Sequence, residues 1–466
     1  MTDMKRFLSF SLLTALLEPS AQTATRTNPN ILLIVADDLG AVDAGCYGAK
    51  DLVTPNIDTL ASRGVRFTQF YAAAPVCSPS RAGLLTGRYP LRAGLTGNAS
   101  SQRDREPAMP GAQVTLAEML KSAGYATAHI GKWHLGFTPD TMPNAQGFDH
   151  SFGHMGGCID NFSHFFYWDG PNRHDLFRNG EEIHAPGRFF GDLMVEEASR
   201  FMEQNRARPF LIYFALNMPH YPYQGEPKWL ERFKDLPYPR NLYAGFVATL
   251  DERIGAVLKK VDELGLRERT LVIFQSDNGH STEQRAHVGG GSAGPYRGAK
   301  FSLFEGGIRL PAIISWPGQL PESQARDQVV HACDWMPTIA ELANVKLINS
   351  QIDGKNILPV IRSARAPSPH EVLHWSGGSA TAQWAVREGD WKLIGHAQNT
   401  SGVALSAADK KLFLANLRND VSESLNLADA HPEVVERLRR LHDEWFKAHR
   451  HEASDAPSED RAGNEK

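Results

Sequence analysis

Compact apolar runs alternate along the chain with segments whose apolar residues recur at helical spacing. Residues 31–36, 210–215 and 270–275 are such runs, and their composition predicts strands that are buried on both faces. Residues 125–130 form a fourth, directly after the helical pattern of 115–123. This alternation predicts an α/β fold with a large, mostly parallel central sheet flanked by helices.

The pattern changes towards the C-terminus. Pro367 and Pro369 mark a linker. After it, residues 371–375, 384–387 and 391–394 are typical of short strands, and 432–449 of an amphipathic helix. We therefore expect a large domain over residues 28–365, a smaller α+β domain with a short antiparallel sheet over 366–450, and a disordered tail over 451–466.

The N-terminus has the layout of a secretory signal peptide. Lys5 and Arg6 precede an apolar run over 7–17, and small or polar residues fill 20–25. The run is too short to span a bilayer. We expect a signal peptide over residues 1–25, a periplasmic or secreted protein and no stable membrane insertion; a frayed apolar N-terminus is the alternative.

Bulk composition excludes some classes of partner. The formal net charge is -4, from 49 basic and 53 acidic residues, which does not suit a nucleic-acid binder. The cysteines Cys46, Cys77, Cys158 and Cys333 show no Cys-x-x-Cys spacing, so neither a zinc site nor a redox motif is indicated. Two disulfides remain open, although burial as small apolar residues explains Cys46 and Cys333 more simply.

Acidic and amide side chains follow two of the expected strands. Asp37 and Asp38 come directly after 31–36, and Asp277 and Asn278 follow 270–275. Acidic loop residues are usually only solvated, but ligands in open α/β sheets gather beyond the carboxyl ends of strands. Three carboxylates and an amide at that edge predict a site for calcium or magnesium.

Basic and imidazole side chains follow the other two strands. Lys132 and His134 alternate in a segment expected to be extended, so both can point the same way. His220 follows 210–215. A lone histidine after a strand is more often structural than catalytic, but these groups share an edge with the expected metal site.

Cys77 precedes an expected helix. Pro79 suits its first turn and Gly87 its end, and Arg81 lies one turn after Cys77. Backbone amides at a helix N-terminus favour negative charge. The segment therefore indicates an activated nucleophile or an anion site, with an inert buried cysteine as the alternative.

The segment Cys77-Ser78-Pro79-Ser80-Arg81, with Leu-Leu-Thr-Gly-Arg-Tyr-Pro after it, resembles the signature of the type I sulfatases of the alkaline phosphatase superfamily. The resemblance covers roughly residues 30–427 and implies an alkaline-phosphatase-like sandwich. Further blocks agree in order: 30–40, 54–58, 131–136, 219–222, 276–279, 298–300, 305–309 and 389–394.

The resemblance implies a formylglycine at position 77, made by a maturation enzyme and hydrated to a diol. Asp37, Asp38, Asp277, Asn278 and the modified Cys77 would hold a calcium or magnesium ion. One diol oxygen would attack sulfur, and the other would release sulfate with His134 as base. Arg81 and Lys132 would stabilise the diol and the sulfate, and Lys300 and His220 would bind sulfate and protonate the leaving oxygen.

The carrier of the sulfate is less well defined. Ala41 and His280 depart from residues frequent in the family, beside the site. Aromatic and polar residues over 153–178 suit a sugar ring, or only a packed loop; they are His154, Asp160, His164, Tyr167, Trp168 and His174, with Phe162, Phe165 and Phe166. We expect an exo-acting sulfatase for sulfated carbohydrates. The alternatives are a broad arylsulfatase acting on aryl sulfates, a phosphatase or phosphonate hydrolase, and a non-catalytic binder of sulfated glycans.

Overall fold

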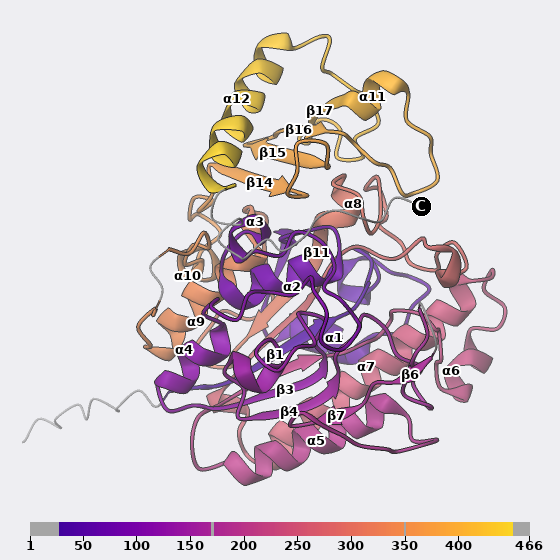
Figure 1. The fold of residues 1–466 in the computed structure, drawn as a ribbon, viewed down its shortest axis with the longest axis vertical. Helices are drawn as coiled ribbons and strands as arrows, with labels where there is room; N and C mark the ends of the chain where they lie inside the picture. Colours follow the sequence, from indigo (N-terminus) through magenta and orange to yellow (C-terminus); the bar gives the residue numbers. More distant parts are fainter. Residues whose placement is uncertain (1–27, 169–171, 349–350, 451–466) are drawn as a thin grey trace, which may run out of the picture.

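The computed structural model describes residues 28–168, 172–348 and 351–450. Its lower part in Figure 1 is built on an 11-stranded sheet whose centre is parallel. Strand β1 (Asn30–Ala36) lies between β9 (Phe210–Ala215) and β10 (Thr270–Ser276). Beyond β9 follow β3 (Ala126–Lys132) and β4 (His150–His154), also parallel. The predicted strands are confirmed, each within one or two residues.

The central sheet is covered by helices on both faces, and every position of β1, β3, β9 and β10 is buried. In β1, Ile31, Leu33 and Val35 belong to one buried cluster, whereas Leu32, Ile34 and Ala36 belong to another. The first cluster includes residues of α2 (Cys77–Thr86), α4 (Leu116–Ser122) and α9 (Trp335–Ala343). The second includes residues of α1 (Pro55–Ser62), α5 (Phe190–Asn205) and α7 (Arg240–Glu263). The predicted sandwich of sheet and helices is confirmed.

Antiparallel strand pairs flank the parallel centre of the sheet. Strand β11 (Arg309–Ser315) runs antiparallel to both β10 and β2 (Val65–Tyr71). The remaining short elements are β5 (Phe165–Phe166), β6 (Arg173–His174), β7 (Phe177–Arg178), β8 (Glu181–Glu182), β12 (Gln324–Arg326), β13 (Val330–His331), α3 (Pro90–Ala93), α6 (Pro227–Arg232), α8 (Glu305–Ile308) and α10 (Leu358–Arg362).

A four-stranded antiparallel sheet forms the upper part in Figure 1. It consists of β14 (Val372–Ser376), β15 (Trp384–Glu388), β16 (Trp391–Gly395) and β17 (Leu412–Asn416), with α11 (Ala407–Lys411) before the last strand. Helix α12 (Pro432–His449) packs Val434 and Leu438 against Leu393 and Leu414. The pattern predicts the first three strands and the helix but misses β17.

Two helix starts show how local chemistry fixes the elements. Thr115 caps α4 by accepting from the Glu118 amide at 3.2 Å, while Glu118 accepts from the Thr115 amide at 2.7 Å, a reciprocal capping box. Thr54 occupies the cap position of α1 but makes no side-chain cap. Its hydroxyl instead accepts from the Gly45 amide at 2.8 Å, tying the preceding loop to the helix.

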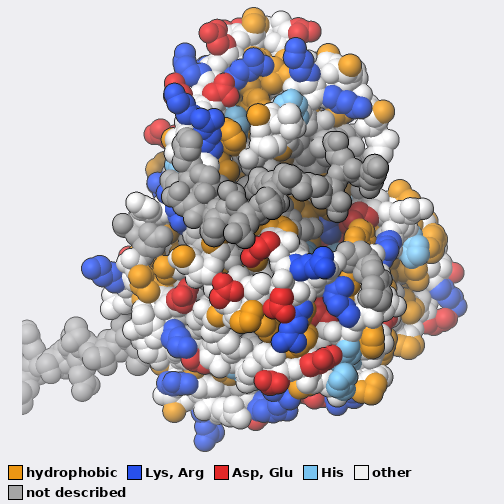
Figure 2. All heavy atoms as spheres, in the orientation of Figure 1, with side chains coloured by type: hydrophobic (Ala, Val, Ile, Leu, Met, Phe, Trp, Pro, Cys, Tyr) orange, Lys and Arg blue, Asp and Glu red, His pale blue; other side chains and the backbone are white. Residues whose placement is uncertain are grey.

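Several sequence-based expectations concern the ends of the chain and its surface. The expected signal peptide and tail lie outside the described residues, and the domain boundary at 365–366 stays a prediction. Among the described residues, no helix is long and apolar enough to cross a membrane. All four cysteines are free in the structure. Figure 2 shows basic and acidic side chains interspersed over the face it displays.

Candidate functional site

The expected strand-end residues meet at one edge of the sheet. Ala36 pairs with Ser276, and Gly131 pairs with Ala215, so the four strands end nearly level. Asp37 and Asp38 leave β1, Asp277 and Asn278 leave β10, and Lys132 is the last residue of β3. Parallel pairing, through its register, therefore gathers charges that are far apart in the sequence.

Asp37 lies between two cations. Lys132 Nζ is 3.0 and 2.8 Å from the two carboxylate oxygens of Asp37, and Arg81 Nη2 is 3.6 Å from Oδ1. Burial alone would raise the pKa of Asp37, but Lys132 and the other cations outweigh it and hold that pKa well below its usual value. Asp37 is therefore ionised although it is fully buried.

The other two carboxylates have cationic partners of their own. Arg81 Nη2 lies 2.8 Å from Asp277 Oδ2, and Lys300 Nζ lies 3.0 Å from Asp38 Oδ2. Burial raises the pKa of Asp38 to about 7, with Lys300 opposing the rise. Three carboxylates thus face three cations, and their charges balance when all six groups are ionised.

Cys77 lies at the centre of this arrangement. It is the first residue of α2, is 1% exposed, and its Sγ lies 3.6 Å from Asp37 Oδ1. Helix α2 ends as expected at Gly87, whose φ is 65°. Burial raises the pKa of the Cys77 thiol. The unmodified thiol is therefore protonated, because desolvation outweighs the neighbouring cations, and the expected nucleophile or anion site at this position stays a prediction.

The oxygen-rich side chains fit a hard divalent cation. One ligand atom each of Asp37, Cys77 and Asp277 lies within 4.8 Å of the others. Asn278 donates its amide nitrogen to Asp38 Oδ1 at 2.6 Å, while its buried Oδ1 has no hydrogen-bond partner among the described residues. A buried acceptor left without a partner is costly, and carboxylate and amide oxygens are the ligands that calcium and magnesium prefer.

His134 does not continue the extended backbone of the strand that carries Lys132. The expected strand alternation stops after Lys132, because His134 has a φ of 55° and the chain turns there. His134 lines the same cavity as Cys77. Burial, and then the charge of Lys132, hold the pKa of His134 well below its usual value. Its ring is therefore neutral.

His220 is oriented by its neighbour. Its Nδ1 lies 2.7 Å from the Tyr221 carbonyl oxygen, so Nδ1 carries the proton and Nε2 faces Asp38 Oδ2 at 3.7 Å. Burial and the charge of Lys300 keep the pKa of His220 well below its usual value. The neutral ring therefore presents an acceptor nitrogen towards the site.

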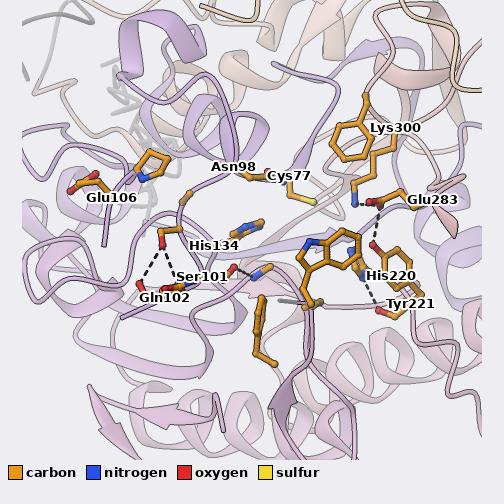
Figure 3. Close-up of a pocket in the computed structure, with 18 residues that line it drawn as sticks. Cys77, Asn98, Ser101, Gln102, Glu106, His134, His220, Tyr221, Glu283 and Lys300 are labelled. Atoms are coloured by element: carbon orange, nitrogen blue, oxygen red, sulfur yellow. Dashed lines mark hydrogen bonds and ion pairs between the residues drawn. The ribbon is translucent and has the colours of Figure 1, made fainter. Parts of the chain in front are cut away.

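A cavity of about 300 Å³ opens above these groups and is drawn in Figure 3. Cys77 lies near the middle of that view, with Lys300, Glu283 and His220 on one side and Asn98, Ser101 and Gln102 on the other. The complete lining is Cys77, Asn98, Ala99, Ser100, Ser101, Gln102, Glu106, Pro107, His134, Gly157, Cys158, Phe166, Trp168, His220, Tyr221, Glu283, Lys300 and Phe301.

The sequence locates the base of the cavity better than its walls. Of the aromatic and polar residues singled out over 153–178, Phe166 and Trp168 line the cavity, while His154 and His164 are buried in the packing. The segment 98–107 and Glu283 carry no recognisable motif. Only the fold reveals, for example, that Asn98 Oδ1 accepts from the Ser78 amide at 3.2 Å.

Comparisons with known proteins identify the family of the chain. Residues 29–345 match the family model described as sulfatase, and residues 298–445 match that of N-sulphoglucosamine sulphohydrolase, C-terminal. Arylsulfatase A of Homo sapiens is 34% identical over 473 residues, which cover 92% of this chain and 90% of the relative. N-acetylgalactosamine-6-sulfatase of Homo sapiens is 33% identical, with 89% and 84% covered.

A solved structure is also similar throughout. Ps i-CgsB in complex with k-i-k-neocarrahexaose superimposes with a TM-score of 0.79 at 31% identity, covering 90% of this chain and 93% of the other. The sulfatase model alone spans more than half of the chain. The protein therefore belongs to the type I sulfatase family and is a sulfuric ester hydrolase.

Proposed function

We propose that this sulfatase removes sulfate from the ends of sulfated carbohydrates, using a formylglycine made from Cys77 and one bound calcium ion. The observation that carries the proposal is the position of Cys77 Sγ, 3.6 Å from Asp37 Oδ1 and at the base of the cavity. A thiol with a raised pKa is a poor nucleophile, whereas an aldehyde hydrate at the same position offers two oxygens.

Asp37, Asp38, Asp277, Asn278 and the modified residue 77 would hold the calcium ion, with magnesium as the alternative. The cation supplies Lewis-acid stabilisation of the charge that develops on sulfate oxygens. Arg81 and Lys132 add fixed positive charge beside residue 77. Because these cations are already anchored on Asp277 and Asp37, they need not reorganise during the reaction.

Proton transfers are assigned to the neutral and cationic side chains around the cavity. His134, whose pKa is lowered by burial, would accept the proton of the second diol hydroxyl and so promote release of sulfate. Lys300 lies at the base of the same cavity, and its ammonium group would give a proton to the leaving oxygen. His220 would bind beside it, with its ring fixed by the Tyr221 carbonyl oxygen.

The cavity walls favour a sugar as carrier of the sulfate. Trp168 is 40% exposed and Phe301 is 36% exposed, so both offer aromatic faces at the cavity. A volume of about 300 Å³ accommodates one sugar ring, which favours exo action. Relatives named N-acetylgalactosamine-6-sulfatase and a neighbour bound to a carrageenan oligosaccharide support this choice, and simple aryl sulfates would fit the same space.

The maturation and location of the protein are part of the proposal. A formylglycine-generating enzyme would act on the segment around Cys77 before folding closes over it, because the residue is 1% exposed in the folded chain. The basic and apolar pattern of residues 1–25 supports export to the periplasm or the medium.

Parallel assays test the proposed reaction. The wild-type protein with calcium should release sulfate from an aryl sulfate much faster than phosphate from the matching aryl phosphate or phosphonate ester. A preference for either phosphorus ester would favour a phosphatase or phosphonate hydrolase. Tight binding of sulfated glycans without turnover, by protein whose residue 77 is fully converted, would favour a binding protein.

A further inference from the structure

The charge of the cavity changes sign away from Cys77. Among the described residues that line it, Lys300 is the one lysine or arginine, whereas Glu106 and Glu283 are both acidic. In the view of Figure 3, these two glutamates lie on opposite sides of Cys77. A substrate whose sulfate is held at the base of the cavity therefore meets two carboxylates further along the walls, while Arg285 and Arg173 lie over Trp168 and Phe166 of the lining.

Glu283 is the more firmly held of the two. Its Oε2 accepts from Tyr221 Oη at 3.0 Å and from Ser281 Oγ at 2.9 Å, and Lys300 Nζ lies 3.4 Å away. No hydrogen bond from a described residue reaches its Oε1. Glu283 therefore offers a carboxylate oxygen with unused acceptor capacity in the wall of the substrate cavity.

The turn that follows Glu283 is strained. The Glu283 carbonyl oxygen accepts from the amides of Ala286 at 2.9 Å and Val288 at 3.1 Å, which closes a tight turn. His287 and Val288 adopt positive φ values of 54° and 67° in that turn. A branched residue rarely adopts such a conformation, and strain of this kind is concentrated at functional sites.

We infer that Glu283 determines specificity: it selects a substrate that is uncharged apart from the scissile sulfate and disfavours one with a second sulfate or a carboxylate nearby. This inference rests on the proposed function and narrows its substrate class to neutral sugars. Two like charges about 6 Å apart at an effective dielectric constant of about 20 discriminate by up to about 100-fold. The free Oε1 accepts a hydrogen bond from a sugar hydroxyl.

A pair of nearly isosteric probes tests this inference without knowledge of the natural sugar. The probes are 3-carbamoylphenyl sulfate, which is neutral beyond its sulfate, and 3-carboxyphenyl sulfate, which carries a second anion. The ratio of their kcat/KM values is measured for wild type, Glu283→Gln and Glu106→Gln. Comparing each variant's ratio with that of wild type cancels the difference in leaving-group reactivity.

We expect Glu283→Gln to reduce the preference for the neutral probe by about tenfold, mostly through the KM of the charged probe. Glu106→Gln should reduce it less, because Glu106 is exposed and screened. The control variant Glu341→Gln, on an exposed position of α9, should leave the ratio unchanged.

The outcomes distinguish a failure of the inference about Glu283 from a failure of the proposed function. If both probes are hydrolysed and Glu283→Gln leaves their ratio unchanged, the inference is overturned while the proposed function stands. If wild type hydrolyses neither probe nor any sulfated sugar, the proposed function fails and the inference fails with it. Since only a ratio is read, a general loss of activity in the variant does not obscure the result.

Discussion

Two buried clusters in this protein combine carboxylates with lysine, yet they differ in whether they are closed. In the closed cluster, Lys392 Nζ lies 2.9 Å from Glu305 Oε1 and 3.0 Å from Glu423 Oε1, and all three residues are 0% exposed. In the open cluster, Asp37, Asp38 and Asp277 are also buried, but the arrangement opens onto a cavity of about 300 Å³.

The difference lies in how completely the protein satisfies each cluster. Glu305 Oε2 also accepts from Tyr71 Oη at 2.6 Å, and Glu423 Oε2 accepts from the Glu305 amide at 2.6 Å. These contacts join α8 of the large sheet's part to β16 of the small sheet's part. Glu423 Oε1 accepts no hydrogen bond from a described residue, but its ion pair with Lys392 Nζ at 3.0 Å compensates its charge. In the open cluster, Asn278 Oδ1 has no hydrogen-bond partner among the described residues. The closed cluster is structural, whereas the open one is prepared for ligands.

The largest expected effect comes from removing the nucleophile in the open cluster. Cys77→Ala should lower kcat by at least about 10⁴-fold, as removal of a nucleophile does elsewhere, while the melting temperature stays close to that of wild type. Steady-state assays and calorimetry measure both. Cys333→Ala, at another buried free cysteine, should keep its activity; turnover by Cys77→Ala would refute the nucleophile assignment.

Breaking the closed cluster should lower the stability of the protein and leave its kcat unchanged. Lys392→Met leaves two buried glutamates without their shared cation, so the free energy of unfolding should fall by about 3–5 kcal/mol. Molecules that remain folded should keep their kcat, because Lys392 lies outside the cavity. Denaturant titration measures the change, with exposed Lys410→Met as the control. An unchanged stability would mean that the closed cluster does not hold the parts built on the large and the small sheet together.

Within the open cluster, Lys300→Ala should cost about 2–4 kcal/mol of transition-state stabilisation, as loss of a fixed oxyanion donor does. Removal of the Lys300 ammonium group, which lies 3.0 Å from Asp38 Oδ2, should also weaken binding of the substrate sulfate. Kinetics with a poor and a good leaving group separate these effects: the loss should be larger for the poor one. Equal, small losses for both would make Lys300 a bystander.

Calcium should stabilise the open cluster alone. At a free concentration about 100 times its Kd, an ion that binds only the folded state adds about 2.7 kcal/mol. Chelation should therefore lower the melting temperature and abolish activity, and calcium should restore both. Asp277→Ala should bind no calcium and show no response to the chelator; full metal content in that variant would remove Asp277 from the proposed site.

The smallest expected effect is the pH dependence of the closed cluster. Burial raises the pKa of Glu423 to about 7, against 4.5 for the free side chain, whereas the cations hold the pKa of Glu305 at about 2. A raised carboxyl pKa means that ionisation opposes folding, so stability should fall as pH rises from about 4.5 to 7. The contribution of Glu305 is lost only as pH falls from about 4.5 towards 2.

Melting temperatures between pH 5 and 8 in saturating calcium test this sign. The metal keeps Asp38, whose pKa is also raised, from contributing to the slope. Glu423→Gln should flatten the fall that wild type shows. A slope that is the same in both proteins would mean that Glu423 does not titrate in this range.

The comparison also shows what a sequence can reveal. The open cluster was predictable because parallel strands bring their carboxyl ends to one edge, and Asp37, Asp277 and Lys132 each stand directly at such an end. The closed cluster was not, since Glu305 and Glu423 are separated by 118 residues and neither marks the end of a central strand. Only the packing of the two sheets reveals their contact.

Some residues of the cavity walls were also not predictable, because they do not stand at the ends of central strands. Glu283 and Asn98 reach the site from irregular segments, where no periodicity constrains direction. The thiol of Cys77 illustrates a different limit: its position before a helix suggested an activated nucleophile or an anion site, but complete burial, which the sequence does not encode locally, raises the pKa of the unmodified thiol. Strand ends could thus be assigned in advance, whereas loops and desolvation required the structure.

The central claim is that residue 77 works as an aldehyde hydrate and not as a thiol. Mass spectrometry of the tryptic peptide over residues 67–81, taken from fully active protein, tests it most directly. The account predicts that the fraction of peptide carrying formylglycine at position 77 rises in proportion to specific activity across preparations. Full activity in protein whose peptide contains only unmodified cysteine would contradict it.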